Sequence, residues 1–354
     1  MKPLHGKRVL ITGGTGSLGK VLVRRILSGE MGTPASVLVF SRDEAKQHYM
    51  RLDYMHRTVA TDETIYKNFQ SLLKFRIGDV RDQHSVTAAL RDADVVFNAA
   101  ALKQVPTCEY TPFEAVRTNI AGPENIVRAI AEHALPVETV VGISTDKACK
   151  PVNVMGMTKA LQERVFIQGN MRCPSTRFVC VRYGNVLASR GSVIPLFHDQ
   201  IRTGGPVTIT TVDMTRFLLS LDEAVDTVFA AVSEAKPGET YIPVCPSARM
   251  VDLAAALIGN RPIETKITGI RPGEKIHEIL IGEEESFRAV RRGRYHAILP
   301  MLPEICSDSS PAEHLDGEYS SGKAPMSAAE VVETLRRRKL MLDQVVADGQ
   351  ELLA

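Results

Sequence analysis

Near its start the chain reads Val9-Leu10-Ile11-Thr12-Gly13-Gly14-Thr15-Gly16-Ser17-Leu18-Gly19, and the fold can be worked out from there. A short apolar run rich in β-branched residues leads into a glycine cluster, and an amphipathic segment, Lys20 to Leu27, follows at once. This order predicts a strand, a tight turn and a helix. We expect Gly13 to make the turn, Gly16 to let the backbone approach a pyrophosphate, and Gly19 to let helix and strand pack closely.

The start of the predicted helix is a candidate binding site for the phosphates of a dinucleotide, because its N–H groups have no partners within the helix. Glycine also marks ordinary turns, so the strand before the cluster and the helix after it are what make the pattern specific. Thr15, Ser17 and Leu18 lie between the glycines, and we expect them to contact the cofactor as well.

Length and composition favour one large or two modest domains, since 44% of the 354 residues are hydrophobic. A net charge of +2 gives no general attraction to nucleic acid or to an anionic membrane. No apolar run approaches the roughly 18 residues of a membrane span. Six scattered cysteines without a C-x-x-C pair indicate reduced thiols in a cytoplasm. We expect no metal site.

Strands and helices alternate through the first half of the chain, which predicts parallel βαβ units. The fold class is therefore α/β, with a Rossmann-type doubly wound parallel sheet and right-handed crossovers. Ligands of such sheets bind beyond the carboxyl ends of the strands. After the first strand, the predicted strands cover residues 36–40, 74–80, 94–101, 139–143 and 177–182.

Residues directly after the second strand bear on the choice of cofactor. Ser41 and Arg42 come first, and Lys46 follows about one helical turn later. A basic set at this strand end suits the 2′-phosphate of NADP, although a solvated basic helix start is the alternative.

The third and fourth strands also end in candidate cofactor contacts. Asp79, which precedes Val80, could accept from the adenine amino group or cap the next helix near residue 82. The small residues Ala99 and Ala101 would let the cofactor lie against the backbone.

The chain divides by composition into three regions. Residues 1–185 are the predicted NADP-binding domain, to which residues 215–235 return, and residues 186–282 are a smaller mixed substrate-binding domain rich in glycine and proline. Residues 283–354 are a more charged C-terminal extension that would cover the site or make an oligomer contact. Within it, Ser327 and Glu330 match a capping box before a helix.

The candidate catalytic residues follow the fifth predicted strand. Met155 and Lys159 lie one turn apart on the predicted helix. In the short-chain dehydrogenase/reductase superfamily this helix carries Tyr-x-x-x-Lys, in which the tyrosine exchanges a proton and the lysine holds the nicotinamide ribose. Because the thioether of Met155 cannot exchange a proton, either the chain has no redox activity or another group supplies the base.

Asp146 and Lys147 are the available substitutes for the missing tyrosine. An acid and a base side by side suit a β-elimination, in which one takes a carbon-bound proton and the other protonates a departing hydroxyl. Lysine is a base only where its pKa is lowered, and Asp146 would raise the pKa of Lys147. A surface ion pair at the end of a strand is the alternative.

With these motifs the chain resembles the UDP-N-acetylglucosamine 4,6-dehydratases of bacterial polysaccharide and flagellin-glycan synthesis, in the extended short-chain dehydrogenase/reductase family. The resemblance is strongest to the capsular branch that inverts C5, which also has Met-Gly at the positions of Met155 and Gly156. The segments that carry it, in order along residues 6–282, are 12–19, 99–106, 144–147, 182–186, 189–193, 214–217 and 271–278.

The resemblance implies an internal redox reaction. Bound NADP takes hydride from sugar C4, Lys147 removes the C5 proton, Asp146 helps the C6 hydroxyl leave as water, and hydride returns to C6. Reprotonation of C5 on the opposite face would give an L-configured 4-keto-6-deoxy sugar. Our hypothesis is that Lys147, or a water it holds, also serves as the base at C4.

The resemblance further implies that the substrate is UDP-N-acetylglucosamine and that the protein is a homo-oligomer, a dimer or hexamer. Lys103, Arg190, Arg216, Arg271 and Lys275 are cations that could meet a diphosphate. By the resemblance, Val186 and Arg190 lie near the cofactor. The predicted substrate contacts are Lys103, Ile143, Ser144, Asn185, Val193, Thr210, Arg216, Arg271 and Glu274.

Two other functions remain open on the sequence. A UDP-sugar 4-epimerase shares fold and cofactor but needs no C5 base, so the Asp146-Lys147 pair disfavours it. A non-catalytic NADP-binding regulator is conceivable because the tyrosine is absent. His277 is predicted to be a helix-start or packing residue rather than a catalyst.

Overall fold

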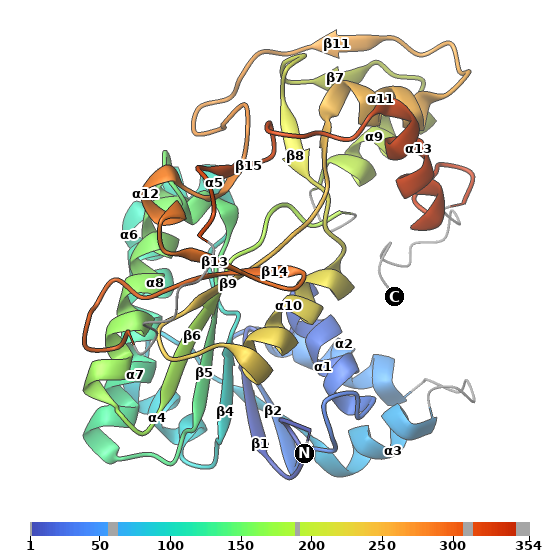
Figure 1. Cartoon of the computed structure of the whole chain (residues 1–354). Helices are drawn as coiled ribbons and strands as arrows, with labels where there is room; N and C mark the ends of the chain where they lie inside the picture. The colour runs from blue at the N-terminus through green and yellow to red at the C-terminus, as the bar shows by residue number, and fades with distance from the viewer. Residues whose placement is uncertain (1, 56–62, 188–191, 307–313, 345–354) are drawn as a thin grey trace.

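A computed structural model describes residues 2–55, 63–187, 192–306 and 314–344. Within these residues nine strands form one sheet in the order β13-β14-β9-β6-β5-β4-β1-β2-β3 (Figure 1). The strands from β3 to β9 pair in parallel, and β14 and β13 are added antiparallel at one edge. The strands are β1 Arg8–Thr12, β2 Ser36–Ser41, β3 Leu73–Ile77, β4 Val95–Asn98, β5 Thr139–Ile143, β6 Arg177–Val181, β9 Thr240–Pro243, β13 Ala289–Arg292 and β14 Tyr295–Ile298.

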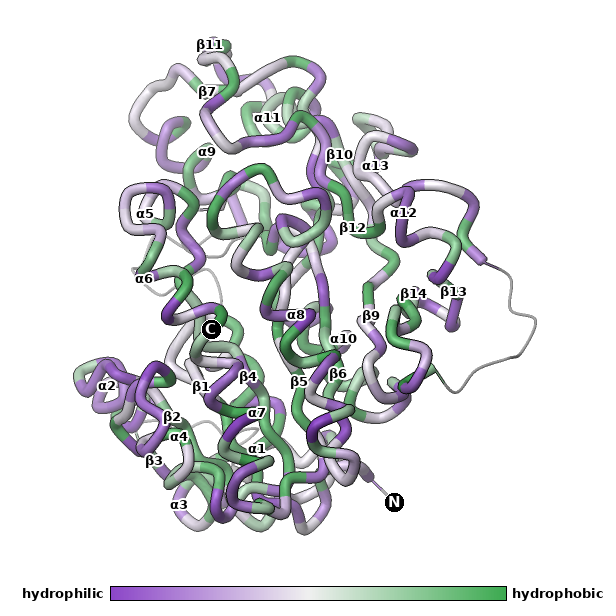
Figure 2. The backbone as a smooth tube through the Cα atoms, turned by 90° about the vertical axis from the view of Figure 1, so that its left-hand side faces the viewer, coloured by the Kyte–Doolittle hydropathy of each residue, from purple (hydrophilic) through white to green (hydrophobic). Residues whose placement is uncertain are grey.

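The order 3-2-1-4-5-6 within this sheet is that of a Rossmann fold, which confirms the predicted fold class. The central strands are buried on both faces, as parallel strands covered by helices must be. Every residue of β5 is buried, and Figure 2 shows β5 and β6 as hydrophobic segments between the helices, while α2 at the edge is largely hydrophilic.

Helices cover both faces of the sheet. On one face α4 (Gln83–Leu90), α7 (Gly122–His133) and α8 (Val154–Arg172) pack side by side (Figure 1). The other face is covered by α1 (Ser17–Leu27), α3 (Glu63–Leu72) and α10 (Leu221–Glu234). Helix α10 lies within residues 215–235, the segment expected to return to this domain, and it packs against α1, β5 and β6.

A smaller unit stands beyond the carboxyl ends of the parallel strands (Figure 1), and we call it the upper unit. Its apolar centre is built from helices α9, α11 and α13 with two short sheets, which pair β7 with β11 and β8 with β10. Its elements are α9 Val193–Arg202, β7 Val207–Ile209, β8 Thr215–Phe217, β10 Ser247–Arg249, α11 Met250–Ile258, β11 Thr265–Ile267 and α13 Ala328–Arg337.

Short segments connect the main helices. They are α5 (Val105–Tyr110), α6 (Pro112–Val116), a π-helix η2 (Arg117–Ala121), a 3₁₀-helix η3 (Asp146–Ala148), α12 (Glu283–Ser286), and the strand pair β12 (Ile279–Ile281) and β15 (Tyr319–Ser320). None of the described helices has the length and apolar character that crossing a bilayer requires.

The boundaries of the sheet differ from those expected. β9 falls within the region predicted to bind substrate, and β13 and β14 fall within the predicted C-terminal extension, yet all three join the main sheet. The reason is that strands pair through backbone groups over long sequence separations. The strand β8, expected to return with residues 215–235, pairs with β10 in the upper unit instead.

Between β2 and β3 the described residues contain two helices, α2 (Glu44–Met55) and α3. Ile65 and Phe69 are four residues apart and both are buried, so α3 has an apolar face of its own. Phe69 stacks on Tyr54 of α2 with ring centroids 5.4 Å apart. The capping box predicted at Ser327 and Glu330 is confirmed at the start of α13.

Candidate active site

A cavity of about 1400 Å³ lies between the sheet and the upper unit. Its lower wall consists of the segments that follow β1, β2, β4, β5 and β6, and its upper wall comes from residues 208–218, 250, 268 and 271–274. This is the edge of the sheet at which ligands of open α/β folds bind. Among the described residues, those after 282 do not contribute to the lining.

The cavity brings together most of the residues predicted from the sequence. Asp79 and Asp146 lie outside its lining, and Arg190 lies outside the described residues. The predicted residues that line it are Gly13, Thr15, Gly16, Ser17, Leu18, Gly19, Ser41, Arg42, Lys46, Val80, Ala99, Ala101, Lys103, Ile143, Ser144, Lys147, Met155, Lys159, Asn185, Val186, Val193, Thr210, Arg216, Arg271 and Glu274.

The glycine loop after β1 fits a dinucleotide. Gly13 has φ +67°, and a Cβ there would lie 2.7 Å from the backbone nitrogen of Ala100. A Cβ on Gly19 would lie 2.5 Å from the Cα of Gly14, so only glycine allows α1 to start this close to the loop. No side chain caps α1 at Gly16, which leaves its first N–H groups available to phosphate.

The end of β2 carries an exposed cation. The Arg42 guanidinium is half exposed and lies 3.7 Å from Asp79, whereas Lys46 is paired with Asp43 at 2.9 Å. Asp79 itself is held by the Arg81 guanidinium at 2.6 Å. The residue that caps α4 is Asp82, so the capping role predicted for Asp79 is wrong.

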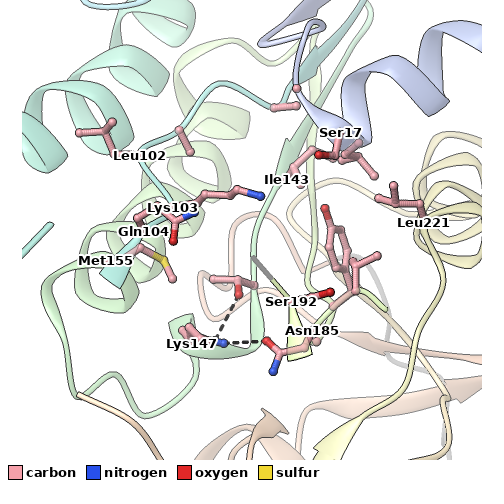
Figure 3. A pocket seen from close by; sticks show the side chains of 18 of the residues that line it. Ser17, Leu102, Lys103, Gln104, Ile143, Lys147, Met155, Asn185, Ser192 and Leu221 are labelled. Carbon is pink, nitrogen blue, oxygen red and sulfur yellow. Dashed lines mark hydrogen bonds between the residues drawn. The ribbon is translucent and has the colours of Figure 1, made fainter. Parts of the chain in front are cut away.

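Lys147 is the centre of a cluster of polar side chains at the end of β5. Its Nζ donates to Oδ1 of Asn185 (3.0 Å, dashed in Figure 3), to Oδ1 of Asp146 (3.1 Å) and to Oε1 of Glu278 (3.4 Å). Burial would lower the pKa of Lys147, but the charges of Asp146 and Glu278 outweigh this effect and raise it. Without ligand, Lys147 is therefore an ammonium group.

Asp146 is completely buried beneath this lysine. Its Oδ1 also accepts from the Thr145 hydroxyl at 2.7 Å, while its Oδ2 has no hydrogen-bond partner among the described residues. The alternative that Asp146 and Lys147 form a surface ion pair is therefore wrong, because Asp146 is buried and its contact with Lys147 is partly buried.

The helix α8 places Met155 and Lys159 as the sequence predicted, one turn apart in the cavity wall. Met155 lies on the same side of the pocket as Gln104 and Lys147 (Figure 3). Lys159 donates to the carbonyl of Ile143 and to Gln162, and burial lowers the pKa of its amine to about 8.

Tyr183 is a phenol in the cavity that sequence reasoning did not single out. It follows β6, so its place beside the motif after β5 depends on strand pairing and not on a local pattern. Burial and then the charge of Asp146 raise the pKa of Tyr183. A phenol that keeps its proton this firmly is a poor replacement for the missing tyrosine base.

The upper unit contributes cations. Arg216 reaches the cavity from β8, with its Nη1 donating to the carbonyl of Thr215 at 2.7 Å and its Nε 3.6 Å from Glu278. Arg271 and Glu274 line the wall from a turn. Lys275 does not: its Nζ donates to the carbonyl of Cys149 at 2.6 Å, so the diphosphate contact predicted for it is wrong.

A family model described as polysaccharide biosynthesis protein matches residues 9–300 of the chain. The chain belongs to this family. A relative from Campylobacter jejuni, a UDP-N-acetylglucosamine 4,6-dehydratase (inverting), is 38% identical over 339 residues, covering 92% of this chain and 96% of its own. A UDP-glucose 4-epimerase from Rickettsia typhi is 43% identical over 297 residues, covering 82% of each chain.

Solved structures share the fold of this chain. The crystal structure of Pen from Bacillus thuringiensis matches with a TM-score of 0.82 and 33% identity, over 96% of this chain and 99% of that one. A dTDP-glucose 4,6-dehydratase from Streptomyces venezuelae, solved with NAD bound, shares the fold with a TM-score of 0.62 and 20% identity, over 76% and 86% of the two chains.

In this member of the polysaccharide biosynthesis family, a buried ion-pair network around Arg182 contacts the residue that precedes the motif Thr145-Asp146-Lys147. The Arg182 guanidinium, 2% exposed, pairs with Glu163 of α8 at 2.6 Å and with Glu285 of α12 at 2.7 Å. Glu163 also accepts from the hydroxyl of Ser144, which directly precedes the motif Thr145-Asp146-Lys147. The network therefore ties the start of the motif to α8 and to the C-terminal part of the chain.

His277 is an exposed residue in the bend before β12, so it is not at a helix start, and its ring contacts other residues on one side. Its Nδ1 lies 2.9 Å from the Thr215 hydroxyl, and a Cβ on Gly322 would lie 2.8 Å from the same nitrogen, so the ring is enclosed on that side.

Proposed function

We propose that this protein is a UDP-N-acetylglucosamine 4,6-dehydratase that inverts C5 and acts in bacterial surface polysaccharide synthesis. The observation that carries the proposal is Lys147, which lines the same cavity as the dinucleotide loop and is paired with the buried Asp146 behind it, while Met155 occupies the position where a tyrosine base is usual. The Campylobacter jejuni relative, which is named for this activity and has a similar length, supports it.

The residues in and behind the cavity wall would have separate roles in the reaction. A nicotinamide dinucleotide bound on the glycine loop would supply hydride uptake at C4 and hydride return at C6. Lys147 would take the C5 proton, and Asp146 would assist departure of the C6 hydroxyl by way of the Lys147 amine that it contacts. Asn185 fixes the position of that amine.

The sugar nucleotide would be held from both walls of the cavity. Lys103 extends its amine into the pocket from the segment that follows β4 (Figure 3), and Arg216 and Arg271 come from the upper unit. Three cations from separate elements suit a diphosphate, for which arginine offers a bidentate fork.

The test is the product formed from UDP-N-acetylglucosamine in D₂O, followed by proton NMR. We expect a 4-keto-6-deoxy sugar nucleotide in which C5 carries solvent deuterium and has the inverted configuration. Unchanged substrate, with the cofactor bound to the protein, would contradict the proposal.

A 4-epimerase is the second candidate, favoured by the Rickettsia typhi relative, which is named as a UDP-glucose 4-epimerase. The same NMR experiment distinguishes it, because an epimerase would form UDP-N-acetylgalactosamine with no deuterium at C5. The buried Lys147–Asp146 pair disfavours this candidate, since epimerisation at C4 removes no C5 proton. A regulator that binds cofactor would show neither product.

We further propose NADP as the cofactor, on the position of Arg42 at the end of β2. Replacing Arg42 with alanine should weaken NADP⁺ binding at least about tenfold, the size of one lost hydrogen bond to a charged group. Binding of NAD⁺ should stay unchanged. Calorimetric titration with both cofactors measures this, with Lys74→Ala, an exposed cation of β3, as control. Equal affinity of the native protein for the two cofactors would contradict the prediction.

Met155 is expected to shape the cavity and to exchange no proton. Replacing it with leucine conserves volume and should cost less than about 1.5 kcal/mol of stability. Turnover should remain of the same order as in the native protein, with Met157→Leu on the exposed side of α8 as the matched control. A loss of about 100-fold in a folded protein would instead mark a catalytic role.

We propose a homo-oligomer, because apolar side chains are exposed on neighbouring helices: Tyr110 and Phe113 on α5 and α6, and Met157 and Leu161 on α8. Sedimentation of the purified protein tests this.

All six cysteines are unpaired, which suits a reducing compartment, and we propose the cytoplasm as the location.

A further inference from the structure

Glu278 is a second buried carboxylate beside Lys147, and the roles proposed above do not use it. It directly precedes β12 and is 3% exposed. Its backbone N–H donates to the Ser321 hydroxyl at 2.9 Å, which fixes the residue against the segment that follows β15. It does not line the cavity, so any effect of Glu278 on a ligand must pass through a neighbour.

Two side chains connect Glu278 to the cavity. Its Oε1 lies 3.4 Å from the Nζ of Lys147 and 3.6 Å from the Nε of Arg216, and both of these residues line the wall. Its Oε2 is buried and has no hydrogen-bond partner among the described residues. A buried oxygen of this kind carries a desolvation cost that protonation would relieve.

The charged groups that face Glu278 come from three elements. Asp146 and Lys147 come from η3, Arg216 comes from β8, and Lys275 comes from the turn before β12. Burial and then the charge of Asp146 raise the pKa of Glu278, and the three cations oppose this. The two carboxylates thus compete for the cations around them.

The cluster poses a problem for the chemistry of Lys147. As a base at C5 the lysine must present a neutral amine, yet its carboxylate neighbours favour the ammonium form. Releasing that proton to water would leave the buried cluster with one more negative charge, which burial opposes. A proton that stays inside the cluster avoids this cost.

We propose that Glu278 stores the proton that Lys147 gives up, so that a neutral amine faces the sugar. In this step one N–H bond of the Lys147 ammonium breaks and one O–H bond forms on Glu278, and the total charge of the cluster is unchanged. The amine can then accept the C5 proton and become an ammonium again. Glu278 is a positioning residue that acts through Lys147, and the inference rests on the proposed dehydratase function.

The test compares native protein with Glu278→Gln by the rate at which solvent deuterium enters C5 of UDP-N-acetylglucosamine, measured between about pH 6 and pH 9. In the native protein we expect a nearly flat profile, because the amine is formed by internal transfer. In Glu278→Gln the amine must lose its proton to water. Its rate should be at least about tenfold lower at neutral pH and rise about tenfold per pH unit toward the lysine pKa.

Two controls separate this role from a structural one. Glu239→Gln removes another buried, paired glutamate far from the motif, and it should leave the profile flat. Glu278→Asp keeps a carboxyl group, so its pH profile should stay flat at a lower rate. If Glu278→Gln does not fold, Glu278→Asp is used for the test in its place. If the pH profile of Glu278→Gln is as flat as that of the native protein, the inference is wrong, whatever the absolute rate of the variant.

Failure of the proposed function gives a different result. In that case the native protein itself, with sugar nucleotide bound, would incorporate no deuterium at C5 at any pH. This outcome would remove the C5 step and the inference with it, whereas a flat profile in Glu278→Gln would leave the dehydratase function standing.

Discussion

Replacing Lys147 with alanine is expected to reduce turnover of UDP-N-acetylglucosamine by about 1000-fold, the range of a lost general acid–base group. The amine of Lys147 is the cationic atom that Asp146, Asn185 and Glu278 together hold at the cavity wall. Tyr183 retains its proton and Met155 carries none, so neither can take over at C5.

The experiment separates the two steps in which the lysine is proposed to act. With substrate deuterated at C4, reduction of the bound cofactor reports the first step, and loss of the C5 hydrogen reports the second. We expect both to fail in Lys147→Ala. Retained cofactor reduction would exclude Lys147 from the C4 step and leave it only the C5 role.

Folding must be checked in the same variants, because removal of the ammonium leaves buried carboxylates without their cation. Lys147→Met keeps the length of the side chain and should be as inactive as the alanine variant. Lys150→Ala, which removes a neighbouring lysine paired with Glu318 outside the cavity, is the matched control and should retain turnover. Normal turnover in Lys147→Met would contradict the catalytic assignment.

Replacing Arg182 with alanine is expected to destabilise the protein by about 3–5 kcal/mol, the cost of leaving buried charges uncompensated. The guanidinium satisfies Glu163 and Glu285 at once and also donates to the carbonyl of Leu280 at 2.9 Å. Its loss leaves the buried carboxylate of Glu163 and the mostly buried carboxylate of Glu285 without their cation.

Chemical denaturation measures this effect, and a compound variant supplies the control. Arg182→Met combined with Glu163→Gln and Glu285→Gln removes all the charges and should recover most of the lost stability. If the single and compound variants are equally unstable, the cost comes from packing and not from charge. Because Glu163 accepts from Ser144, the single variant should also impair turnover.

The ion pairs of Arg182 also predict the direction in which the stability of the protein changes with pH. Burial would raise the pKa of Glu285, but the Arg182 charge holds it down at about 2. Its stabilising contribution is therefore complete above the unfolded pKa of about 4.3 and is lost as the pH falls toward the folded value. In Arg182→Ala the largest effect that lowers the pKa of Glu285 is gone, so this pKa is higher than in the native protein, and the stability difference from native protein should shrink between neutral pH and about pH 4.

Much of the site was visible in the chain because parallel strands end at one edge of the sheet. The loop at Gly13–Gly19, the basic residues after β2 and the pair Asp146-Lys147 each follow a strand directly, so finding the strands also placed these residues together. Met155 and Lys159 needed only the spacing of one helical turn. Each of these features is encoded by residues that lie within a few positions of one another in the sequence.

Other parts of the structure depend on contacts that no local pattern contains. Glu278 meets Lys147 across 131 residues, Arg182 meets Glu285 across 103, and β14 pairs with β9 from a segment expected to be an extension. Local spacing placed the dinucleotide loop and the lysine, because a turn, a strand end and a helical repeat are encoded by adjacent residues. Only the tertiary fold decided which buried charges surround that lysine, because long-range packing alone brings distant carboxylates and cations within ion-pair distance.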